Sequence, residues 1–594
     1  MISFISPLVV FFIGALLMLF LKNTARLVCC VIVCIAVFMC LLNISQGVYP
    51  IVEFWGYTLT LRFDALSLPF AYAFVIATLI GMIYSHHLKS SKEHFWGFVY
   101  AASVMGAVFA GDLITLFVFW ELMTIAAMFI IWASKTKAAQ GAGFRYLLVH
   151  LFGGLCLLAG IIMKVHYTGS IEFGYVGMDL GIASWLMLIG FMVNAAIPPL
   201  HAWLTDAYPK ASITGIIFLS AFTTKAAVYV LARAFAGTEL LIILGAVMMV
   251  YPLIFIVLEN DLRRVLSYSL INQIGFMIVA IGIGTPLAIN GAVAHAFVHI
   301  IYKALLFMSI GAVMYRVGSA KVTNLGGLYR TMPLTMIFCV IGALSISAFP
   351  LFSGFAAKSV IVSAVAEEHL TYVWLTIMFV SAGAIYWIKV PYFAFFNKDS
   401  GKRPKEAPLN MKVAMGIAAL ICVVVGILPS VLYDILPYSM NYMPYELSNV
   451  MKQLLLLSFV FLAFSLWLKS GYYPKERRSE ILDLDWIYRK LAPIVVSFAG
   501  KGVLWVYRRL NYIFLDWLPS MLIWMSKSPA LALKIWFSKL VMYFMPFGWE
   551  EARSAIEKAE KEYPANVLPH WSMSSSIAFM IILLTLYLVD YYFL

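Results

Sequence analysis

Apolar runs of bilayer-spanning length recur through almost the whole chain. A helix needs about 20 mostly apolar residues to cross the roughly 30 Å hydrocarbon core of a membrane. With 63% hydrophobic and 12% charged residues, the chain carries more apolar surface than a water-soluble core could bury. Because lipid offers no hydrogen bonds to the backbone, spans must be helices or closed barrels. Runs of this length predict an all-α, polytopic membrane protein.

The runs predict about sixteen transmembrane helices. They lie near residues 2–21, 27–44, 66–85, 95–110, 112–133, 145–163, 183–198, 214–234, 240–258, 265–284, 287–314, 332–365, 371–396, 409–432, 452–468 and 574–592. The first run has neither a basic region before it nor a small-residue cleavage site after it, so we expect a span and not a signal peptide.

Lysine and arginine mark the cytoplasmic loops of membrane proteins. If the N terminus lies outside, the predicted inner loops hold most of the basic residues of the first fourteen spans. The outer loops then hold little beyond Arg62, Lys164 and Arg233. We therefore expect the N terminus outside, and the net charge of +13 reflects this asymmetry and not nucleic-acid binding.

Two predicted spans contain prolines that break the helical hydrogen bonds: Pro198-Pro199 in span seven and Pro350 in span twelve. Membranes tolerate such breaks where the backbone is buried or lines a wet cavity. Spans four to eight and nine to thirteen form two blocks of five, each broken in its fourth helix. Since five is odd, the blocks must be inverted relative to each other, as in transporters. Two ordinary proline kinks are the alternative.

These patterns predict six segments along the chain. They are an N-terminal three-helix segment (1–94), the first inverted repeat (95–236), the second inverted repeat (237–397), helices fourteen and fifteen (398–470), an amphipathic interfacial segment on the cytoplasmic side (471–573) and a terminal transmembrane helix (574–594). Tryptophans and basic residues alternate in the fifth segment, a composition typical of helices lying at the headgroup level. A plain membrane-surface tail without a coupling role is the alternative.

Charged side chains at mid-membrane are costly, so each one indicates a function. Those in the predicted spans are Glu121, Lys225, His295, His299, Lys303, Lys358 and Lys389. His295, His299 and Lys303 are spaced four residues apart and share one helix face. Gaps of about 6 Å along the axis exceed a hydrogen bond, so proton transfer between them needs water or a moving side chain. The alternative is that the two histidines are hydrogen-bonded core residues beside a lysine, without a role in proton transfer.

Other site classes find no support in the sequence. A metal site is disfavoured because lysine is a poor ligand and no carboxylate has suitable spacing. No phosphate loop, dinucleotide fingerprint or nucleophile elbow occurs, so we expect no cofactor and no enzymatic site in this chain. The seven cysteines lie inside apolar runs and are interpreted as small buried hydrophobes.

Several motifs resemble the proton-translocating antiporter family. They are Phe119-Trp120-Glu121, the stretch from Pro199 through His201 and Trp203 to Asp206, Thr224-Lys225, the stretch from Glu259 to Tyr268, His295 to Lys303, and Phe349-Pro350 to Lys358. The family includes antiporter-like subunits of respiratory complex I, membrane-bound hydrogenases and Mrp-type Na⁺/H⁺ antiporters. The resemblance covers roughly residues 50–435 and is strongest to the D-type subunits of Mrp antiporters.

The resemblance implies roles for the matching residues. Glu121 would be the switch carboxylate and Lys225 the central proton-carrying lysine, while His295, His299 and Lys303 would relay protons to Lys358 on the outlet side. His201, Asp206 and Lys389 would have secondary pathway or gating roles. Asn194 stands where relatives often have lysine, which leaves Glu121 without that local countercharge, and Thr205 replaces the family's usual proline.

The resulting expectation is a proton-conducting subunit of a multi-subunit Na⁺/H⁺ antiporter in a bacterial or archaeal plasma membrane. Its partners would be other small membrane subunits of the complex, the lipid bilayer, H⁺ and Na⁺. A hard cation wants several oxygen ligands, and Glu121, with Asp206, offers too few here, so a neighbouring subunit would supply any Na⁺ site. The alternatives are a pumping subunit of a redox complex and, from another class, a membrane scaffold or lipid-modifying enzyme.

Overall fold

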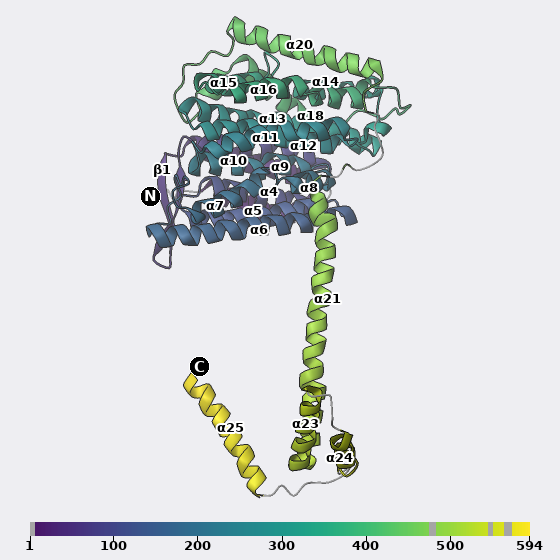
Figure 1. The fold of residues 1–594 in the computed structure, drawn as a ribbon. Coiled ribbons are helices and arrows are strands. Elements are labelled where there is room, and N and C mark those ends of the chain that lie inside the picture. The colour runs from purple at the N-terminus through teal and green to yellow at the C-terminus, as the bar shows by residue number, and fades with distance from the viewer. Residues whose placement is uncertain are drawn as a thin grey trace. The chain divides into compact units, whose positions relative to one another are not determined.

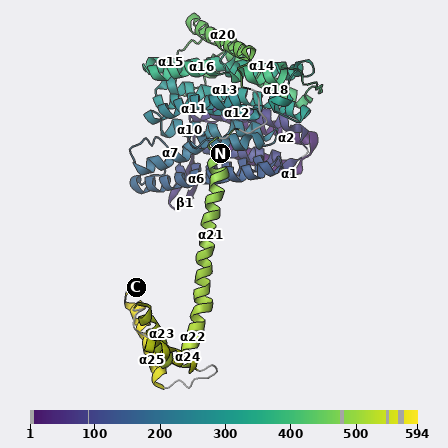
Figure 2. The same ribbon diagram turned by 45° about the vertical axis from the view of Figure 1, so that its right-hand side comes forward.

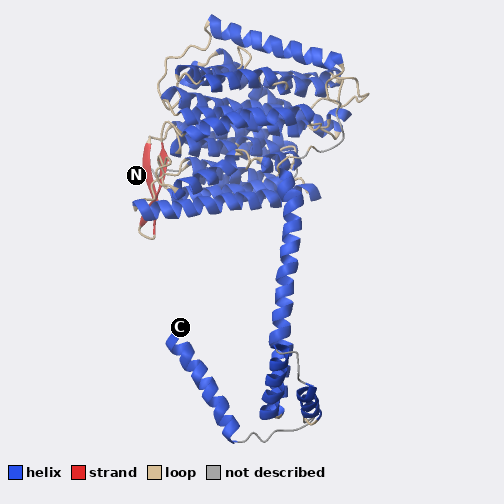
Figure 3. Ribbon diagram, viewed as in Figure 1, coloured by secondary structure: helices blue, strands red, loops and turns tan. Residues whose placement is uncertain are grey.

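The computed structural model describes residues 6–88, 90–474, 481, 483–544, 550–563 and 573–593. The chain divides into two compact units, Met1–Trp486 and Ile487–Leu594, which are described separately below. Helices make up most of both units (Figures 1 and 3).

Three helices and one hairpin open the first unit. The helices are α1 (Pro7–Phe20), α2 (Asn23–Leu42) and α3 (Ser67–Tyr84). Between α2 and α3, β1 (Gly47–Phe54) pairs antiparallel with β2 (Tyr57–Phe63), the sheet drawn red in Figure 3. The hairpin turns at Trp55-Gly56, both with positive φ. This hairpin was not anticipated from the sequence, although its alternating β-branched and polar residues around a glycine turn are a strand signal.

The first predicted block is made of seven helical pieces. They are α4 (Ser91–Val108), α5 (Leu113–Trp132), α6 (Lys137–Thr168), α7 (Ile182–Ala195), α8 (Ala202–Ala207), α9 (Gly215–Ala221) and α10 (Thr223–Ala234). The second block is made of α11 (Glu239–Leu258), α12 (Leu262–Ile283), α13 (Pro286–Val317), α14 (Pro333–Ile346), α15 (Ser353–Glu367), α16 (Thr371–Gly383) and α17 (Tyr386–Pro391).

The remaining helices of the first unit are α18 (Leu409–Ile427), the short α19 (Ser430–Tyr433) and α20 (Leu447–Ser470). Figures 1 and 2 show α12 and α13 in the middle of the helical body, with α6 and α20 at opposite edges. The burial agrees, because α12 and α13 are almost wholly enclosed whereas α20 is mostly exposed. By length and composition, twelve helices in the described part of the chain can cross a membrane.

The helices of the two blocks are interrupted at four places. Two of these are the breaks predicted from proline, and two are additional. The first pair follows the prolines: α7 and α8 are separated at residues 196–201, and α14 and α15 at residues 347–352. Ala196, Ala348 and Leu351 adopt positive φ there, at 55°, 60° and 73°. The second pair separates α9 from α10 at Phe222 and α16 from α17 at residues 384–385.

The second pair of breaks contains no proline and was not anticipated from the sequence. In each predicted block, the interrupted helices are the fourth and the fifth. This equivalence is consistent with the predicted repeats, whose inverted relation stays a prediction.

The second unit contains α21 (Ala492–Asn511), α22 (Leu518–Lys527), α23 (Pro529–Phe544), α24 (Glu550–Lys561) and α25 (Met573–Phe593). In α21, whose residues are all described, no side chain is buried. The first compact unit ends at Trp486, and residues 483–486 pack within it. Parts of the predicted interfacial segment (475–480, 482, 545–549 and 564–572) lie outside the described residues.

Candidate ion-translocation site

Four titratable side chains of the first unit lie at its centre with no exposed surface. They are Lys225 on α10 and His295, His299 and Lys303 on α13. The Phe276 ring links this group to α15, because its centroid lies 6.0 Å from that of the His295 ring and 5.0 Å from the Nζ of Lys358. The structure therefore brings together side chains from α10, α13 and α15 that lie far apart in the sequence.

The lysines beside the interruptions donate to backbone carbonyls that the breaks leave free. The Nζ of Lys225 donates to the Ser220 carbonyl at 2.6 Å, across the break between α9 and α10. The Nζ of Lys358 donates to the Ile346 carbonyl at 2.7 Å, across the break between α14 and α15. Carbonyls at a helix C terminus lack intrahelical donors and carry partial negative charge. Each interruption thus supplies an uncharged acceptor for an ammonium group.

Lys389 makes the same kind of contact at the end of α11. Its buried Nζ donates to the carbonyls of Ile256, Val257 and Glu259 at 2.9, 2.8 and 2.9 Å. All three donors of the ammonium group are thereby used. Lys389 joins α17 to the C terminus of α11, away from the central histidines. Its geometry is that of a helix cap.

Lys303 is held by α12, the other enclosed helix. Its Nζ donates to the Leu266 carbonyl at 3.0 Å and to the hydroxyl oxygen of Ser269. No carboxylate is among these acceptors. Like Lys225 and Lys358, Lys303 is held by neutral oxygens, an arrangement in which a proton can be lost without leaving an unpaired anion behind.

The two histidines of α13 lie one turn apart with ring centroids separated by 5.9 Å. Both ring nitrogens of His299 are buried without a hydrogen-bond partner in the part of the chain that the structure describes. Buried polar groups of this kind are usually satisfied by water or are functional. The His299 ring also contacts Tyr302, with centroids 5.2 Å apart.

A chain of hydrogen bonds that sequence reasoning missed continues from His295. Its Nε2 lies 3.1 Å from the Tyr302 hydroxyl, which donates to the Gln273 side-chain oxygen at 3.1 Å. Gln273 in turn donates to the Tyr386 hydroxyl at 2.7 Å, and Tyr386 donates to the Asn272 side-chain oxygen at 3.0 Å. The Asn272-Gln273 pair inside an apolar helix was the sequence signal that could have identified this chain.

A cavity of about 570 Å³ opens beside the end of this chain. Its lining includes Tyr386 and Lys358, and polar side chains of α20 such as Lys452 and Gln453. The Lys358 ammonium also lies 5.0 Å from the centroid of the Phe276 ring, another lining residue. Both the tyrosine–glutamine chain and Lys358 thus end at one partly polar cavity.

Glu121 and Asn194 flank α6 in the first block. The Glu121 carboxylate packs against Gly154 of α6, and Val193 packs against the adjacent Gly153. The Oε1 of Glu121 and both amide atoms of Asn194 have no hydrogen-bond partner among the described residues. None of these three buried atoms therefore has a hydrogen-bond partner among the described residues. Because residue 194 is an asparagine, it supplies no positive charge to Glu121.

Asp206 lies on α8, and His201 lies in the break that precedes this helix, within the first broken span. The Asp206 Oδ2 accepts from Arg145 at 2.7 Å, and its Oδ1 accepts from Lys210 at 2.6 Å. Because both carboxylate oxygens are engaged by cations, Asp206 is not free to ligate Na⁺ in this arrangement. The His201 ring contacts Asp483, a residue that sequence reasoning did not connect with the site.

Among the described residues, no group of three or more histidine, cysteine, aspartate or glutamate side chains is arranged to hold a metal ion. The central groups instead form a buried, mostly basic row with neutral acceptors. Groups of this kind can transfer protons, since lysine and histidine can gain and lose protons without leaving an isolated anion in a medium of low dielectric constant.

Comparison with known proteins matches residues 110–385 to the transmembrane domain of the NADH:quinone oxidoreductase/Mrp antiporter family. A probable K⁺/H⁺ antiporter protein of Rhizobium meliloti, its A/B subunit, is 28% identical over 407 residues, covering 63% of this chain. The present chain spans only 41% of that relative's length. The D subunit of the Na⁺/H⁺ antiporter of Alkalihalophilus pseudofirmus is 27% identical over 368 residues, covering 57% of this chain and 74% of the relative.

Among solved structures, a chain of an archaeal membrane-bound sulfane sulfur reductase superposes with a TM-score of 0.71 at 23% identity. The match covers 86% of this chain and 99% of that one, and it shows a shared fold. Residues 110–385 include Glu121, Lys225, the α13 trio and Lys358, so the matched domain contains the central row. Through residues 110–385, the chain is similar to the NADH:quinone oxidoreductase/Mrp antiporter family of membrane proteins.

Proposed function

We propose that this chain is the proton-conducting subunit of a multi-subunit monovalent cation/proton antiporter. The observation that carries the proposal is the enclosed row of Lys225, His299, His295 and Lys303, which leads to Lys358 and its cavity. The curated relatives named above are antiporter subunits, which supports the same interpretation. Protons would move along the row and exchange for Na⁺ or K⁺ elsewhere in the complex.

The roles within the row follow from its geometry. Lys225 and Lys303 would carry protons through the centre, since each is held only by neutral oxygens in its hydrogen bonds. His299 and His295 would connect them through water, and Lys358 would deliver protons to the cavity. Glu121 would act as the switch carboxylate of the first block, and Asn194, His201, Asp206 and Lys389 would shape the pathway.

The proposed setting is the plasma membrane of a bacterium or archaeon, with the N terminus outside and small membrane subunits as neighbours. On this orientation the Lys358 cavity lies on the outer half of the second block, because it is lined by the parts of α15 and α20 nearer the predicted outer side. Any Na⁺ site would be built by a neighbouring protein of the complex or at an interface, since Asp206 is already paired with Arg145 and Lys210.

The test is cation-driven proton flux in proteoliposomes containing the complete complex. Lys225→Ala and Lys303→Ala should abolish the flux while the complex still assembles, because each removes a buried proton carrier. Lys405→Ala, a change at an exposed lysine, is the matched control and should leave the flux unchanged. Wild-type flux in both buried-lysine variants would overturn the proposal.

A redox-driven pump is the second candidate, and one observation favours it. The structural match to a chain of a respiratory membrane complex covers 86% of the present chain. The two candidates differ in their neighbours and not in this chain's chemistry. Purification of the native complex separates them, because redox and quinone-site subunits would co-purify in the second case and small antiporter subunits in the first.

A further inference from the structure

His201 occupies the break between α7 and α8, and its side chain has no exposed surface. Its ring meets the Tyr251 ring of α11 edge-on, with centroids 4.8 Å apart. The Nε2 of His201 lies 3.3 Å from the Oδ2 of Asp483, whose side chain is also fully enclosed. A carboxylate from beyond α20 is thus buried against the first broken span, within the same compact unit.

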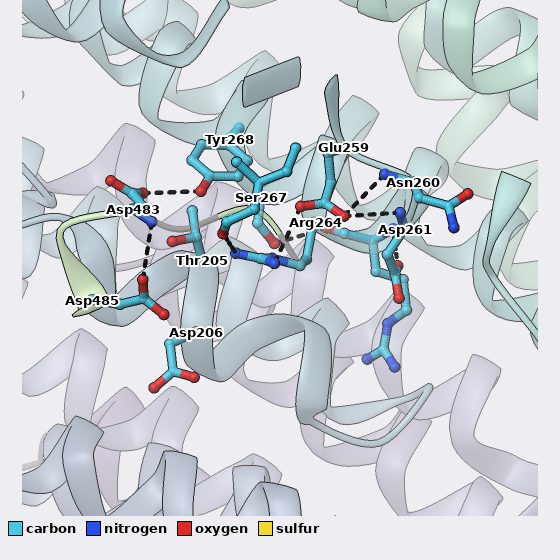
Figure 4. A network of polar contacts seen from close by, with 12 residues as sticks. Thr205, Asp206, Glu259, Asn260, Asp261, Arg264, Ser267, Tyr268, Asp483 and Asp485 are labelled. Carbon is cyan, nitrogen blue, oxygen red and sulfur yellow. Dashed lines mark hydrogen bonds and ion pairs between the residues drawn. The ribbon is translucent and has the colours of Figure 1, made fainter. Parts of the chain in front are cut away.

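Asp483 is held there by several donors. The Tyr268 hydroxyl donates to Oδ2 at 2.9 Å, and the Tyr251 hydroxyl donates to Oδ1. The Leu484 backbone N–H donates to Oδ1 at 2.6 Å. Figure 4 shows the Tyr268 contact and the neighbouring Asp485, whose Oδ1 accepts from the Asp483 N–H at 3.3 Å. So many donors to one buried carboxylate indicate a built site and not an incidental contact.

The surrounding chain is fastened to the junction between α11 and α12. The Tyr473 hydroxyl donates to the Val257 carbonyl at 3.4 Å. The guanidinium of Arg264 donates to the Ile481 carbonyl at 3.5 Å and pairs with Glu259 at 3.2 Å. These contacts fix the position from which Asp483 reaches His201.

Asp483 is the countercharge of His201, because two other carboxylates nearby are already paired with cations. The neighbouring Asp206 is neutralised by Arg145 and Lys210, and Glu259 is paired with Arg264. Burial by itself would raise the pKa of Asp483, but the contacts with His201, Tyr251 and the Leu484 N–H outweigh it and lower the pKa to about 2. Asp483 is therefore ionised throughout the range in which histidine titrates.

We propose that Asp483 is the positioning residue that holds a proton on His201 at the inner end of the first half-pathway. In this role the ring gains and loses one proton at Nε2 or Nδ1, while the carboxylate stays ionised and no other bond changes. The segment after α20 thereby sets the pH range over which protons enter at the first break. This inference rests on the proposed proton-conducting function.

The test is the pH profile of proton flux in proteoliposomes carrying the complete complex. Asp483→Asn keeps the size of the side chain and removes the negative charge that lies 3.3 Å from the His201 Nε2, so the ring loses the charge that holds its proton. The flux at alkaline pH should fall, with the alkaline limb of the profile displaced by about one pH unit, a tenfold change in proton concentration. Asp483→Glu should restore most of the wild-type profile because it restores the charge.

The control is Asp399→Asn, which removes an exposed inner-loop carboxylate paired with Arg403 and should leave the profile unchanged. In a His201→Gln background, Asp483→Asn should have no further effect on the profile, since the carboxylate acts through the ring. A profile for Asp483→Asn that coincides with that of Asp399→Asn would refute the inference, as would an undiminished effect in the His201→Gln background.

A wild-type complex that conducts no protons would instead refute the proposed function. Should Asp483→Asn fail to accumulate, the Asp483→Glu profile decides alone. Because Asp483→Glu keeps the negative charge, its pH profile must then keep the alkaline limb of the wild type. Loss of this limb in Asp483→Glu would contradict the inference.

Discussion

Glu121 packs so closely against Gly154 that a β-carbon at residue 154 would lie 2.0 Å from the carboxylate Oε1. Gly154→Ala must therefore displace the carboxylate, because the neighbouring helix backbone cannot easily retreat. We expect proton flux to fall at least about tenfold while the complex still assembles, since displacement of a transfer group by about 1 Å is costly. Flux in proteoliposomes measures the loss.

Gly416→Ala provides the matched control for this change. Gly416 also lies within a helix, α18, but a β-carbon there meets only Phe338 at an ordinary 3.7 Å. Its flux should equal that of the wild type. Equal flux in Gly154→Ala and Gly416→Ala would show that the position of Glu121 is unimportant for transport.

Apolar runs and prolines predicted much of the architecture. Among the described residues, each predicted span contains helix, and both proline-containing breaks are present. The breaks at Phe222 and at residues 384–385 carry no proline, so no local signal separated them from continuous helix. At the first of these breaks, the Lys225 ammonium donates to the Ser220 carbonyl five residues earlier and so replaces a hydrogen bond lost from the helix.

The central site could be predicted from the sequence, whereas the residues that extend it could not. Lys225 and the α13 trio stand out because charge inside an apolar run is expensive. Tyr302 and Tyr386 carry no formal charge, and tyrosine is common in apolar helices, so only the fold reveals that they join His295 to the cavity. Asp483 lies far beyond its partner in sequence, and no periodicity connects it with His201.

Tyr386→Phe removes the hydroxyl that accepts from Gln273 and donates to Asn272, and so cuts the polar chain from His295. If this chain carries protons to the cavity, flux should fall by about tenfold or more, the scale expected when a positioned proton-transfer group is lost. Tyr392→Phe, further along the same segment, removes a hydroxyl outside this chain and should have no effect. Unchanged flux in Tyr386→Phe would show that Lys358 alone delivers protons to the cavity.

Asn194→Leu tests whether the unpartnered amide of Asn194 belongs to the pathway. The side chain is fully buried, and leaving such polar atoms unpaired by protein costs about 1–3 kcal/mol. Leucine, of similar size, should therefore leave thermal stability in detergent equal or higher while flux falls, because the polar site for water is gone. A less stable variant with normal flux would show that Asn194 is a structural residue.

Arg145→Ala tests the ion pair that joins α6 to Asp206 on α8. The Asp206 side chain is 1% exposed, and the change leaves it with Lys210 alone. A buried carboxylate that loses a bidentate partner should destabilise the protein by about 1–3 kcal/mol, measured by unfolding in detergent. Arg403→Ala breaks an exposed pair with Asp399 that solvent screens, so it should leave the free energy of unfolding almost unchanged. Equal, small effects in both variants would contradict a structural role for Asp206.

Acid should release the segment that carries Asp483. The pKa of this carboxyl falls from 3.8 to about 2 on folding, so its ionised form is the one that the folded state stabilises. The contribution, on the order of 2 kcal/mol, is therefore complete above pH 3.8 and is lost as the pH falls through about 2.

Hydrogen-exchange protection factors for residues 483–486 in detergent, corrected for the intrinsic pH dependence of exchange, measure this release. Protection should be constant from about pH 5 to 7 and should fall below about pH 4. In Asp483→Asn, protection should be lower at neutral pH and independent of pH in the acid range, because the neutral amide cannot titrate. An acid transition of the same size in Asp483→Asn would show that another carboxyl, such as that of Asp485, controls docking of the segment.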